Sequence, residues 1–260
     1  VGDYTVTETV AGITGYTLTT SHKVGSGSKV DGKTATAAVT DGATSNVEFI
    51  NNYAENPGSL KLTKTVTGDR SFADVKATIS FEITGPNGYS ETVSGKQLDA
   101  SGSYTIDNLA KGTYTVKETV TGSTGYTVTT TYKVDGGSTE TGATATAAVP
   151  NGGTAEVAFT NNYKKQVGSL KLTKTVTGDK TLDEVADDIS FEITDSDGNS
   201  KIVSGSDLLA AGGSYTIDNL AVGDYTVTET VAGITGYTLT TSHKVGSGSK
   251  VDGKTATAAV

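Results

Sequence analysis

Apolar and polar residues alternate along most of the chain, in short runs separated by Gly, Asn and Pro. Because successive side chains of a β-strand point to opposite faces, this period of two predicts strands, and the Gly- and Asn-rich breaks predict turns. Only residues 72–75 suggest a helical turn. Within residues 59–163, strands are predicted at residues 60–66, 78–84, 90–94, 103–107, 112–120, 126–134, 144–149 and 155–163. Seven or eight short strands in this space predict an all-β sandwich.

The chain repeats itself at two levels. Residues 1–39 recur unchanged as residues 222–260, and GSLKLTKTVTGD begins at both Gly58 and Gly168. These landmarks predict one complete repeat at residues 59–163, between linkers at residues 54–58 and 164–168. Residues 1–53 then correspond to the back half of a repeat, and residues 169–260 to a repeat without its last strand. We therefore expect an internal segment of a longer tandem array, with neighbouring repeats as partners.

Three polar residues of the complete repeat have the phase of core residues. Lys64 alternates with Leu60, Leu62 and Val66, Glu118 with Tyr114 and Val116, and Asn161 with Val157 and Phe159. The partial repeats carry the same pattern at Lys174 and Glu229, and at Glu8 and Asn51. Each repeat is thus expected to bury a Lys, a Glu and an Asn. Isolated buried charges cost several kcal/mol, so these residues need partners.

Two interpretations follow from this burial. In the first, Lys and Glu form an ion pair that is hydrogen-bonded to Asn, or all three lie at strand ends and reach solvent. In the second, burial lowers the pKa of the Lys and raises that of the Glu, leaving a neutral amine beside a carboxylic acid. A neutral amine is a nucleophile that can attack the Asn side-chain amide. With Glu118 moving the protons, ammonia leaves and an isopeptide bond remains.

The same segments carry a family resemblance. LKLTKTVTGD in the first strand, YTVKET in the middle and FTNNY at the end resemble the Cna B-type, pilin-like isopeptide domains of Gram-positive surface adhesins and pili. The resemblance implies a reverse-Ig sandwich with a self-formed Lys–Asn bond between its first and last strands. It implies crosslinking residues Lys64, Asn161, Lys174 and Asn51, and catalytic residues Glu118, Glu229 and Glu8.

Composition and charge exclude several classes of function. The chain has no Cys, which excludes disulfides and thiol chemistry, and its two His are too few for a His-based zinc site or a Ser-His-Asp triad. A net charge of -9 argues against a nucleic-acid partner. No apolar run is long enough to span a membrane. We predict neither a metal nor a cofactor.

The leading hypothesis is structural. It describes a stalk or shaft segment of a bacterial adhesin or fibre, located outside the cell at its surface or wall. The alternative is a binding module whose loops recognise a host protein or a glycan. We expect no enzyme apart from the self-catalysed crosslink, because no nucleophile-base set or further pair of carboxylates recurs in the repeats.

Overall fold

The computed structural model describes all residues from Val1 to Val260 and confirms the all-β prediction. The chain divides into two compact units, residues 1–122 with 128–163 and residues 123–127 with 164–260. We call residues 1–53 the N-terminal region, residues 59–163 the central domain and residues 169–260 the C-terminal region. None of the helices is long and apolar enough to cross a membrane.

The strands of the central domain follow the predicted pattern closely, and the helical turn predicted at residues 72–75 is present. The helical elements missed by the pattern are three-residue 3₁₀ turns. The elements are β6 (Gly58–Gly68), α1 (Phe72–Val75), η1 (Lys76–Thr78), β7 (Ile79–Thr84), η2 (Pro86–Gly88), β8 (Ser90–Ser94), η3 (Gly95–Gln97), β9 (Ser103–Leu109), β10 (Gly112–Val120), β11 (Tyr126–Val134), β12 (Glu140–Thr141), β13 (Thr144–Val149) and β14 (Thr154–Lys165).

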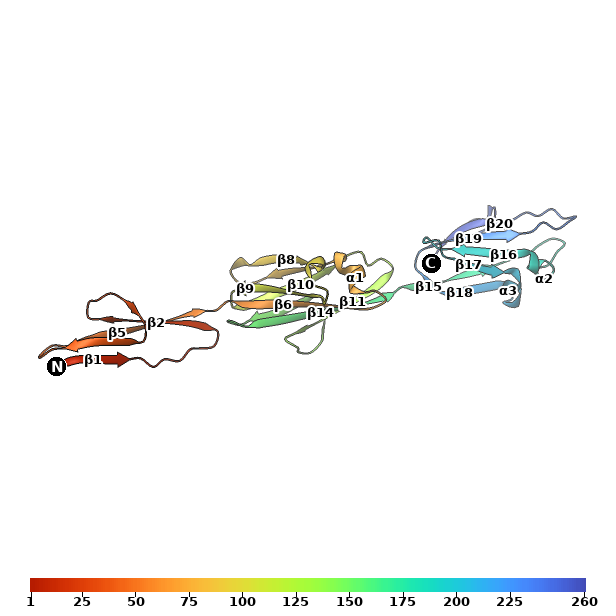
Figure 1. The fold of residues 1–260 in the computed structure, drawn as a ribbon. Helices are drawn as coiled ribbons and strands as arrows, with labels where there is room; N and C mark the ends of the chain where they lie inside the picture. Colours follow the sequence, from red (N-terminus) through yellow and green to blue (C-terminus); the bar gives the residue numbers. More distant parts are fainter. The chain divides into compact units, whose positions relative to one another are not determined.

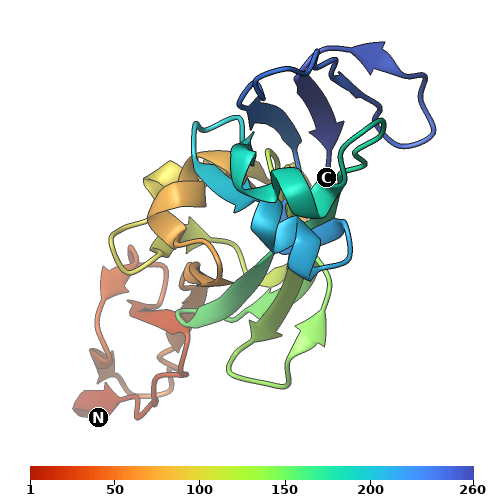
Figure 2. The ribbon, with the colours of Figure 1, turned by 90° about the vertical axis from the view of Figure 1, so that its right-hand side faces the viewer.

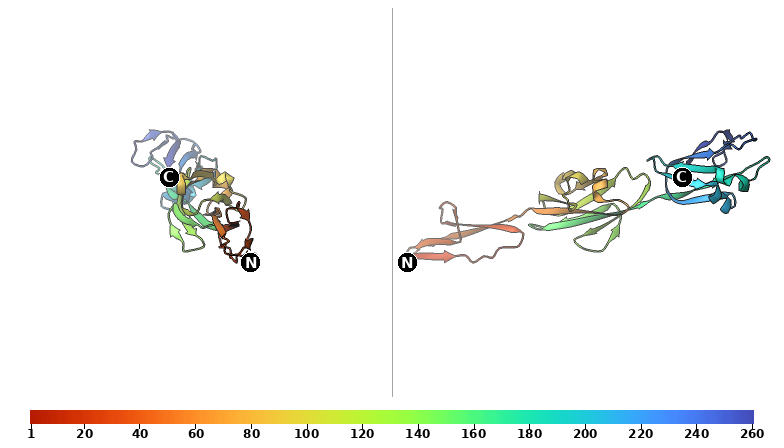
Figure 3. Two further views of the ribbon diagram at one scale, coloured as in Figure 1. Left: turned by 90° about the vertical axis from the view of Figure 1, so that its left-hand side faces the viewer. Right: turned by 45° about the vertical axis from the view of Figure 1, so that its right-hand side comes forward.

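Two sheets pack face to face in the central domain. One has the strand order β12-β11-β14-β6-β9 and the other the order β13-β10-β7-β8. The first and last strands, β6 and β14, are parallel neighbours over ten residue pairs, and Figure 3 shows them side by side. The inner faces bury Leu62, Phe81, Val116 and Val157 completely, as period-two alternation requires.

The N-terminal region contains only the strands that correspond to the back half of the central domain (Figure 1). Its sheets have the orders β1-β4 and β3-β2-β5. Tyr4 and Val6 are 55% and 43% exposed, whereas the corresponding Tyr114 and Val116 of the central domain are buried. The elements are β1 (Gly2–Thr7), β2 (Tyr16–Val24), β3 (Val30–Asp31), β4 (Thr34–Val39) and β5 (Val47–Glu55).

The C-terminal region keeps one four-stranded sheet, β17-β16-β19-β22, but its other sheet is split into the pairs β15-β18 and β20-β21. Its helices α2 and α3 contact each other, and both are visible in Figure 2. The elements are β15 (Val167–Thr173), α2 (Leu182–Val185), η4 (Ala186–Asp188), β16 (Ile189–Thr194), β17 (Ser200–Ser204), α3 (Gly205–Ala210), β18 (Ser214–Ala221), β19 (Asp224–Val231), β20 (Ser242–His243), β21 (Val251–Asp252) and β22 (Thr255–Ala259).

Candidate functional site

The candidate site of the central domain is formed by one side chain from each of three strands. Lys64 in β6 and Asn161 in β14 belong to neighbouring strands of one sheet, in which Lys64 is paired with Phe159, two residues before Asn161. Glu118 is in β10 of the opposite sheet. The pleat directs all three side chains into the space between the sheets, so residues almost 100 positions apart in the sequence meet there.

The three side chains meet at one carboxylate oxygen. Lys64 Nζ lies 2.7 Å from Glu118 Oε1, and Asn161 Nδ2 donates a hydrogen bond of 3.0 Å to the same oxygen. The side chains of Lys64 and Glu118 are fully buried, and Asn161 has no exposed surface. The site is therefore closed off from the surrounding solvent, and the two nitrogen atoms share one partner.

Burial shifts the proton equilibria of this pair. Removal of Lys64 from water lowers its pKa to about 8, although the nearby Glu118 charge acts in the opposite direction. Burial also raises the pKa of Glu118, against the effects of Lys64 and Asn161. Both shifts favour the uncharged forms, an amine and a carboxylic acid.

Two polar atoms at the site lack hydrogen-bond partners. Glu118 Oε2 and Asn161 Oδ1 are buried without one, whereas Lys64 Nζ is held by its ion pair with Glu118 Oε1. Buried polar atoms are usually paired, because leaving one unpaired costs about 1–3 kcal/mol. Two such atoms beside a buried amine indicate a site that is organised for more than packing.

Apolar and aromatic residues enclose the cluster. The ring of Phe159 lies 5.6 Å from that of Phe81 and 5.9 Å from that of Tyr132, measured between centroids. Tyr163, two residues beyond Asn161 on the same face, is also buried, and its pKa is raised by burial and then by the charge of Glu118. Sequence reasoning assigned no role to Tyr163; its two-residue spacing from Asn161 was the available signal that it shares this face.

A glycine lets the loop before β9 lie against the backbone of Lys64. Gly102 has φ +79°, and its carbonyl accepts a 2.8 Å hydrogen bond from Lys64 N. A Cβ at this position would lie 2.3 Å from Lys64 O. A larger residue would therefore force the strand that carries the lysine to move.

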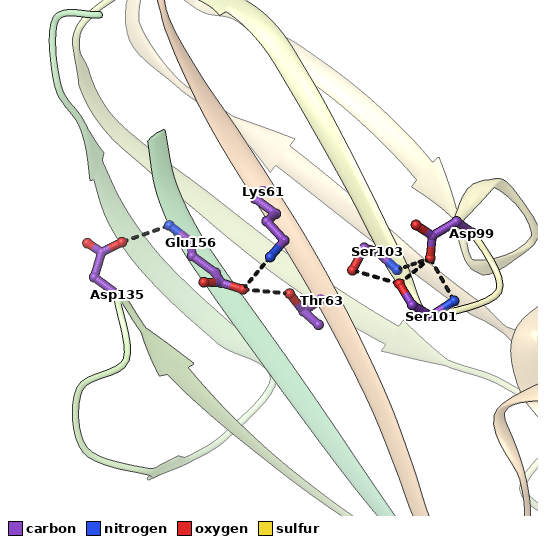
Figure 4. A network of polar contacts seen from close by, with 7 residues as sticks. All are labelled: Lys61, Thr63, Asp99, Ser101, Ser103, Asp135 and Glu156. Atoms are coloured by element: carbon purple, nitrogen blue, oxygen red, sulfur yellow. Dashed lines mark hydrogen bonds and ion pairs between the residues drawn. The ribbon is translucent and has the colours of Figure 1, made fainter. Parts of the chain in front are cut away.

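The outer faces of β6 and β14 carry an exposed ion pair, in contrast to the buried cluster on their inner faces (Figure 4). Glu156 in β14 accepts a hydrogen bond of 2.9 Å from Thr63 and lies 3.2 Å from Lys61 Nζ, and this Lys61–Glu156 ion pair is 42% exposed on both sides. Hydrogen bonds from Thr63 and Lys61 lower the pKa of Glu156. Glu156 is thus an ordinary surface carboxylate with a lowered pKa. The pKa of Glu118, on the inner face of β10, is raised instead.

The C-terminal region holds two of the three groups. Lys174 Nζ lies 2.7 Å from Glu229 Oε1, as in the central domain, but the Lys174 side chain is 17% exposed. Lys174 was predicted to lie within a strand, whereas β15 ends at Thr173. Its counterpart β6 continues to Gly68 because β14 pairs with it over that length, and residues 169–260 contain no such strand.

The N-terminal region holds the complementary two groups. Asn51 Nδ2 donates a 2.6 Å hydrogen bond to Glu8 Oε1. The prediction that both residues are buried is wrong, because Asn51 is exposed and Glu8 is half-buried. The reason is that residues 1–53 provide no opposing strands to cover them. Here the interpretation that the polar residues reach solvent applies, whereas in the central domain it does not.

The fold and the site define a class of protein, β-sandwich repeats of which the complete copy clusters a Lys, a Glu and an Asn between its sheets. The chain belongs to the family described as a domain of unknown function (DUF5979), whose model matches residues 60–164 and 170–260. A comparison with curated protein sequences found no match.

The chain resembles several solved structures, among them the Bacillus anthracis TIE protein, a pilus adhesin and a major pilin. The Bacillus anthracis TIE protein is 19% identical with a TM-score of 0.39, and the match covers 91% of this chain but only 39% of that one. The C-terminal fragment of the pilus adhesin SpaC from Lactobacillus rhamnosus GG is 17% identical over 72% of this chain and 79% of its own, with a TM-score of 0.42. The major pilin T3.2 of Streptococcus pyogenes is 19% identical over 62% and 66%, with a TM-score of 0.33.

Proposed function

We propose that the central domain crosslinks itself through an isopeptide bond between Lys64 and Asn161, and that the repeats serve as stalk segments of a bacterial surface fibre. The observation that carries the proposal is the contact of Lys64 Nζ and Asn161 Nδ2 with the same buried oxygen of Glu118. A buried ion pair alone would need neither the Asn nor the two buried oxygens without partners, Glu118 Oε2 and Asn161 Oδ1.

The chemistry follows from the protonation that burial favours. The neutral amine of Lys64 attacks Cγ of Asn161, and negative charge develops on Oδ1. Glu118, which starts as the carboxylic acid, gives its proton to Nδ2 and takes one from Nζ, so that it ends protonated as it began; its Oε1 already contacts both nitrogen atoms. The Cγ–Nδ2 bond breaks, ammonia leaves, and an amide joins the two side chains. Because the fold holds the amine and the amide close together, the reaction is intramolecular and is faster than between the same groups free in water.

The position of the crosslink supports a role in a stalk. The bond joins the first strand of the domain to the last, and it closes a loop of about 100 residues, worth ~4.7 kcal/mol by the chain-entropy estimate for crosslinks. Tandem repetition of such domains builds length without needing a new binding site in each copy.

The intact mass of the 260-residue chain under denaturing conditions tests the crosslink. We expect a mass lower than the sequence mass by one ammonia, because only the central domain holds all three groups. Glu118→Gln and Asn161→Ala should restore the full mass, since one removes the proton carrier and the other the electrophile.

Glu156→Gln is the matched control, because its carboxylate is exposed on the outer face of β14 and its ion pair is worth about 1 kcal/mol or less. This variant should still lose one ammonia. Circular dichroism shows whether each variant is folded. An unshifted mass in the folded unmutated chain would refute the crosslink.

A further inference from the structure

Tyr163 brings a hydroxyl into the core beside the Lys, Glu and Asn cluster. It follows Asn161 by two residues on the inner face of β14, and it is 2% exposed. The other large aromatic residues that are buried near the cluster, Phe81 and Phe159, have rings without a polar atom. Burying a hydroxyl is unfavourable unless it has a partner, so a tyrosine at this position needs an explanation.

The Tyr163 hydroxyl faces the side chains that would react. Burial raises its pKa, and the charge of Glu118 does so next, while hydrogen bonding with the side chains of Thr78 and Asn161 lowers it. Thr78 already donates its own proton to the carbonyl of Val75, at 2.8 Å. The phenol keeps its proton at neutral pH, and it is therefore a hydrogen-bond donor next to the Asn161 amide.

The main chain of Tyr163 is fixed against the end of β6. Tyr163 pairs with Gly68, and the carbonyl of Tyr163 accepts a 2.8 Å hydrogen bond from Asp69 N. Gly68 has φ +86°, and a Cβ at this position would lie 2.2 Å from Tyr163 O. The ring of Tyr163 thus extends from a backbone that is held in place before any reaction, as a catalytic donor requires.

The reaction needs a donor that the three clustered residues do not supply. When Lys64 attacks Cγ of Asn161, negative charge develops on Oδ1, which is buried without a hydrogen-bond partner. Such a charge is costly in a site closed to solvent unless a donor faces it. Lys64 is the nucleophile, and Glu118 gives its proton to Nδ2, so neither serves Oδ1. The Tyr163 hydroxyl can turn its proton toward Oδ1 by rotation about one bond.

We propose that Tyr163 is a further catalytic residue, whose hydroxyl donates a hydrogen bond to Asn161 Oδ1 in the tetrahedral intermediate. The proposal rests on the crosslink proposed above. The Lys64 Nζ–Asn161 Cγ bond forms, the Cγ–Nδ2 bond breaks, and the protons move through Glu118, while Tyr163 keeps its own proton throughout. Tyr163 therefore changes the rate of the crosslink and leaves the product, and the mass of the product, unchanged.

The test measures the rate of ammonia loss in newly made chains. The 260-residue chain is produced by cell-free translation, synthesis is stopped, and samples are transferred to denaturant at intervals for intact mass. Two non-natural side chains of similar size replace Tyr163. One is para-aminophenylalanine, which keeps a donor at the end of the ring, and the other is para-methylphenylalanine, which has none. The methyl variant should lose ammonia about 10²–10³-fold more slowly than the unmutated chain, and the amino variant should recover most of that rate.

Tyr114→Phe is the matched control, because it removes a buried hydroxyl whose 3.0 Å hydrogen bond goes to the carbonyl of Ala110 instead of to the cluster. It should crosslink at the unmutated rate. Urea unfolding of each variant in the Asn161→Ala background, which cannot react, shows whether the domain is folded. A folded methyl variant should have a midpoint close to that of Tyr114→Phe, so that stability does not account for the difference in rate.

Two outcomes separate this inference from the proposed function. If the folded methyl variant loses ammonia as fast as the unmutated chain, Tyr163 has no catalytic role and the crosslink stands. If the unmutated chain loses no ammonia, the proposed function itself is refuted. Should the methyl group prevent folding, Tyr163→Phe removes the hydroxyl without adding an atom, and the same comparison of rates decides the question.

Discussion

Lys64, Glu118 and Asn161 are ordinary residues whose chemistry is set by where the strands place them. Burial lowers the pKa of the lysine to about 8 and raises that of the glutamate. The exposed Glu156, from the same sandwich, has its pKa lowered by hydrogen bonds to Thr63 and Lys61. Environment rather than residue type therefore separates a surface ion pair from a reactive centre.

The shifted pKa of Lys64 predicts how pH affects the domain when it cannot crosslink. In the Asn161→Ala variant, Lys64 of the folded state loses its proton near pH 8, whereas in the unfolded state it keeps it until about pH 10.5. Between these values the unfolded state binds more protons, so the free energy of unfolding should rise with pH, by at most about 1.4 kcal/mol per pH unit. Urea unfolding at several pH values measures the slope.

The control for this prediction is the double variant Lys64→Met with Asn161→Ala, which has no lysine to titrate. Its slope between pH 8 and pH 10 should be smaller than that of Asn161→Ala alone. The crosslinked domain should also lack this contribution, because an amide nitrogen does not titrate. Equal slopes in the two variants would show that Lys64 titrates in the folded state as it does in water.

At the scale of elements, a strand in this protein depends on its neighbour as much as on its sequence. The segment YTLTTSHKV forms the nine-residue strand β2 where it pairs with β5. Its copy in the C-terminal region, which has no strand equivalent to β5, forms only the two-residue strand β20. Similarly, LKLTKTV continues as β6 beside β14, whereas its copy ends at Thr173. β-propensity thus reflects pairing and burial more than intrinsic backbone preference.

Hydrogen exchange can detect both structures in one experiment. Digestion releases the same peptide from residues 16–24 and from residues 237–245, because the two segments are identical. Amides of the first copy are bonded in the β2–β5 ladder and should exchange slowly, while those of the second copy should exchange fast. We expect a bimodal isotope envelope for this peptide. A single envelope would mean that both copies have the same structure.

How much of this structure can be predicted from the sequence also depends on which neighbouring strands are present. Alternation placed Lys64, Glu118 and Asn161 on inner faces and located the strands of the central domain, because both depend on local period alone. It could not foresee that Lys174 lies beyond the end of β15, or that Asn51 is exposed. Those outcomes depend on which strands are present to pair and to cover, and alternation within one segment does not contain that information.

At the scale of the whole domain, the crosslink determines the response to force. β6 and β14 are parallel neighbours, so tension applied at Gly58 and Lys165 shears the ladder between them. A Lys64–Asn161 bond would carry this load directly. In single-molecule pulling, the unmutated central domain should not extend, whereas Asn161→Ala should lengthen by roughly 340 Å, the reach of the roughly 100 released residues. Glu156→Gln is the control and should behave as the unmutated domain.

The parallel pairing of β6 with β14 also has a topological consequence. With Lys64 bonded to Asn161, the backbone between them forms a closed ring, from which the two flanking segments emerge. A protease that cut the exposed turn at Gly136 would open this ring and add one water to the mass, yet both pieces would remain joined through the side chains. A single cut within the ring would therefore leave the repeats covalently connected. A second cut within the same ring would be needed to release a fragment from it.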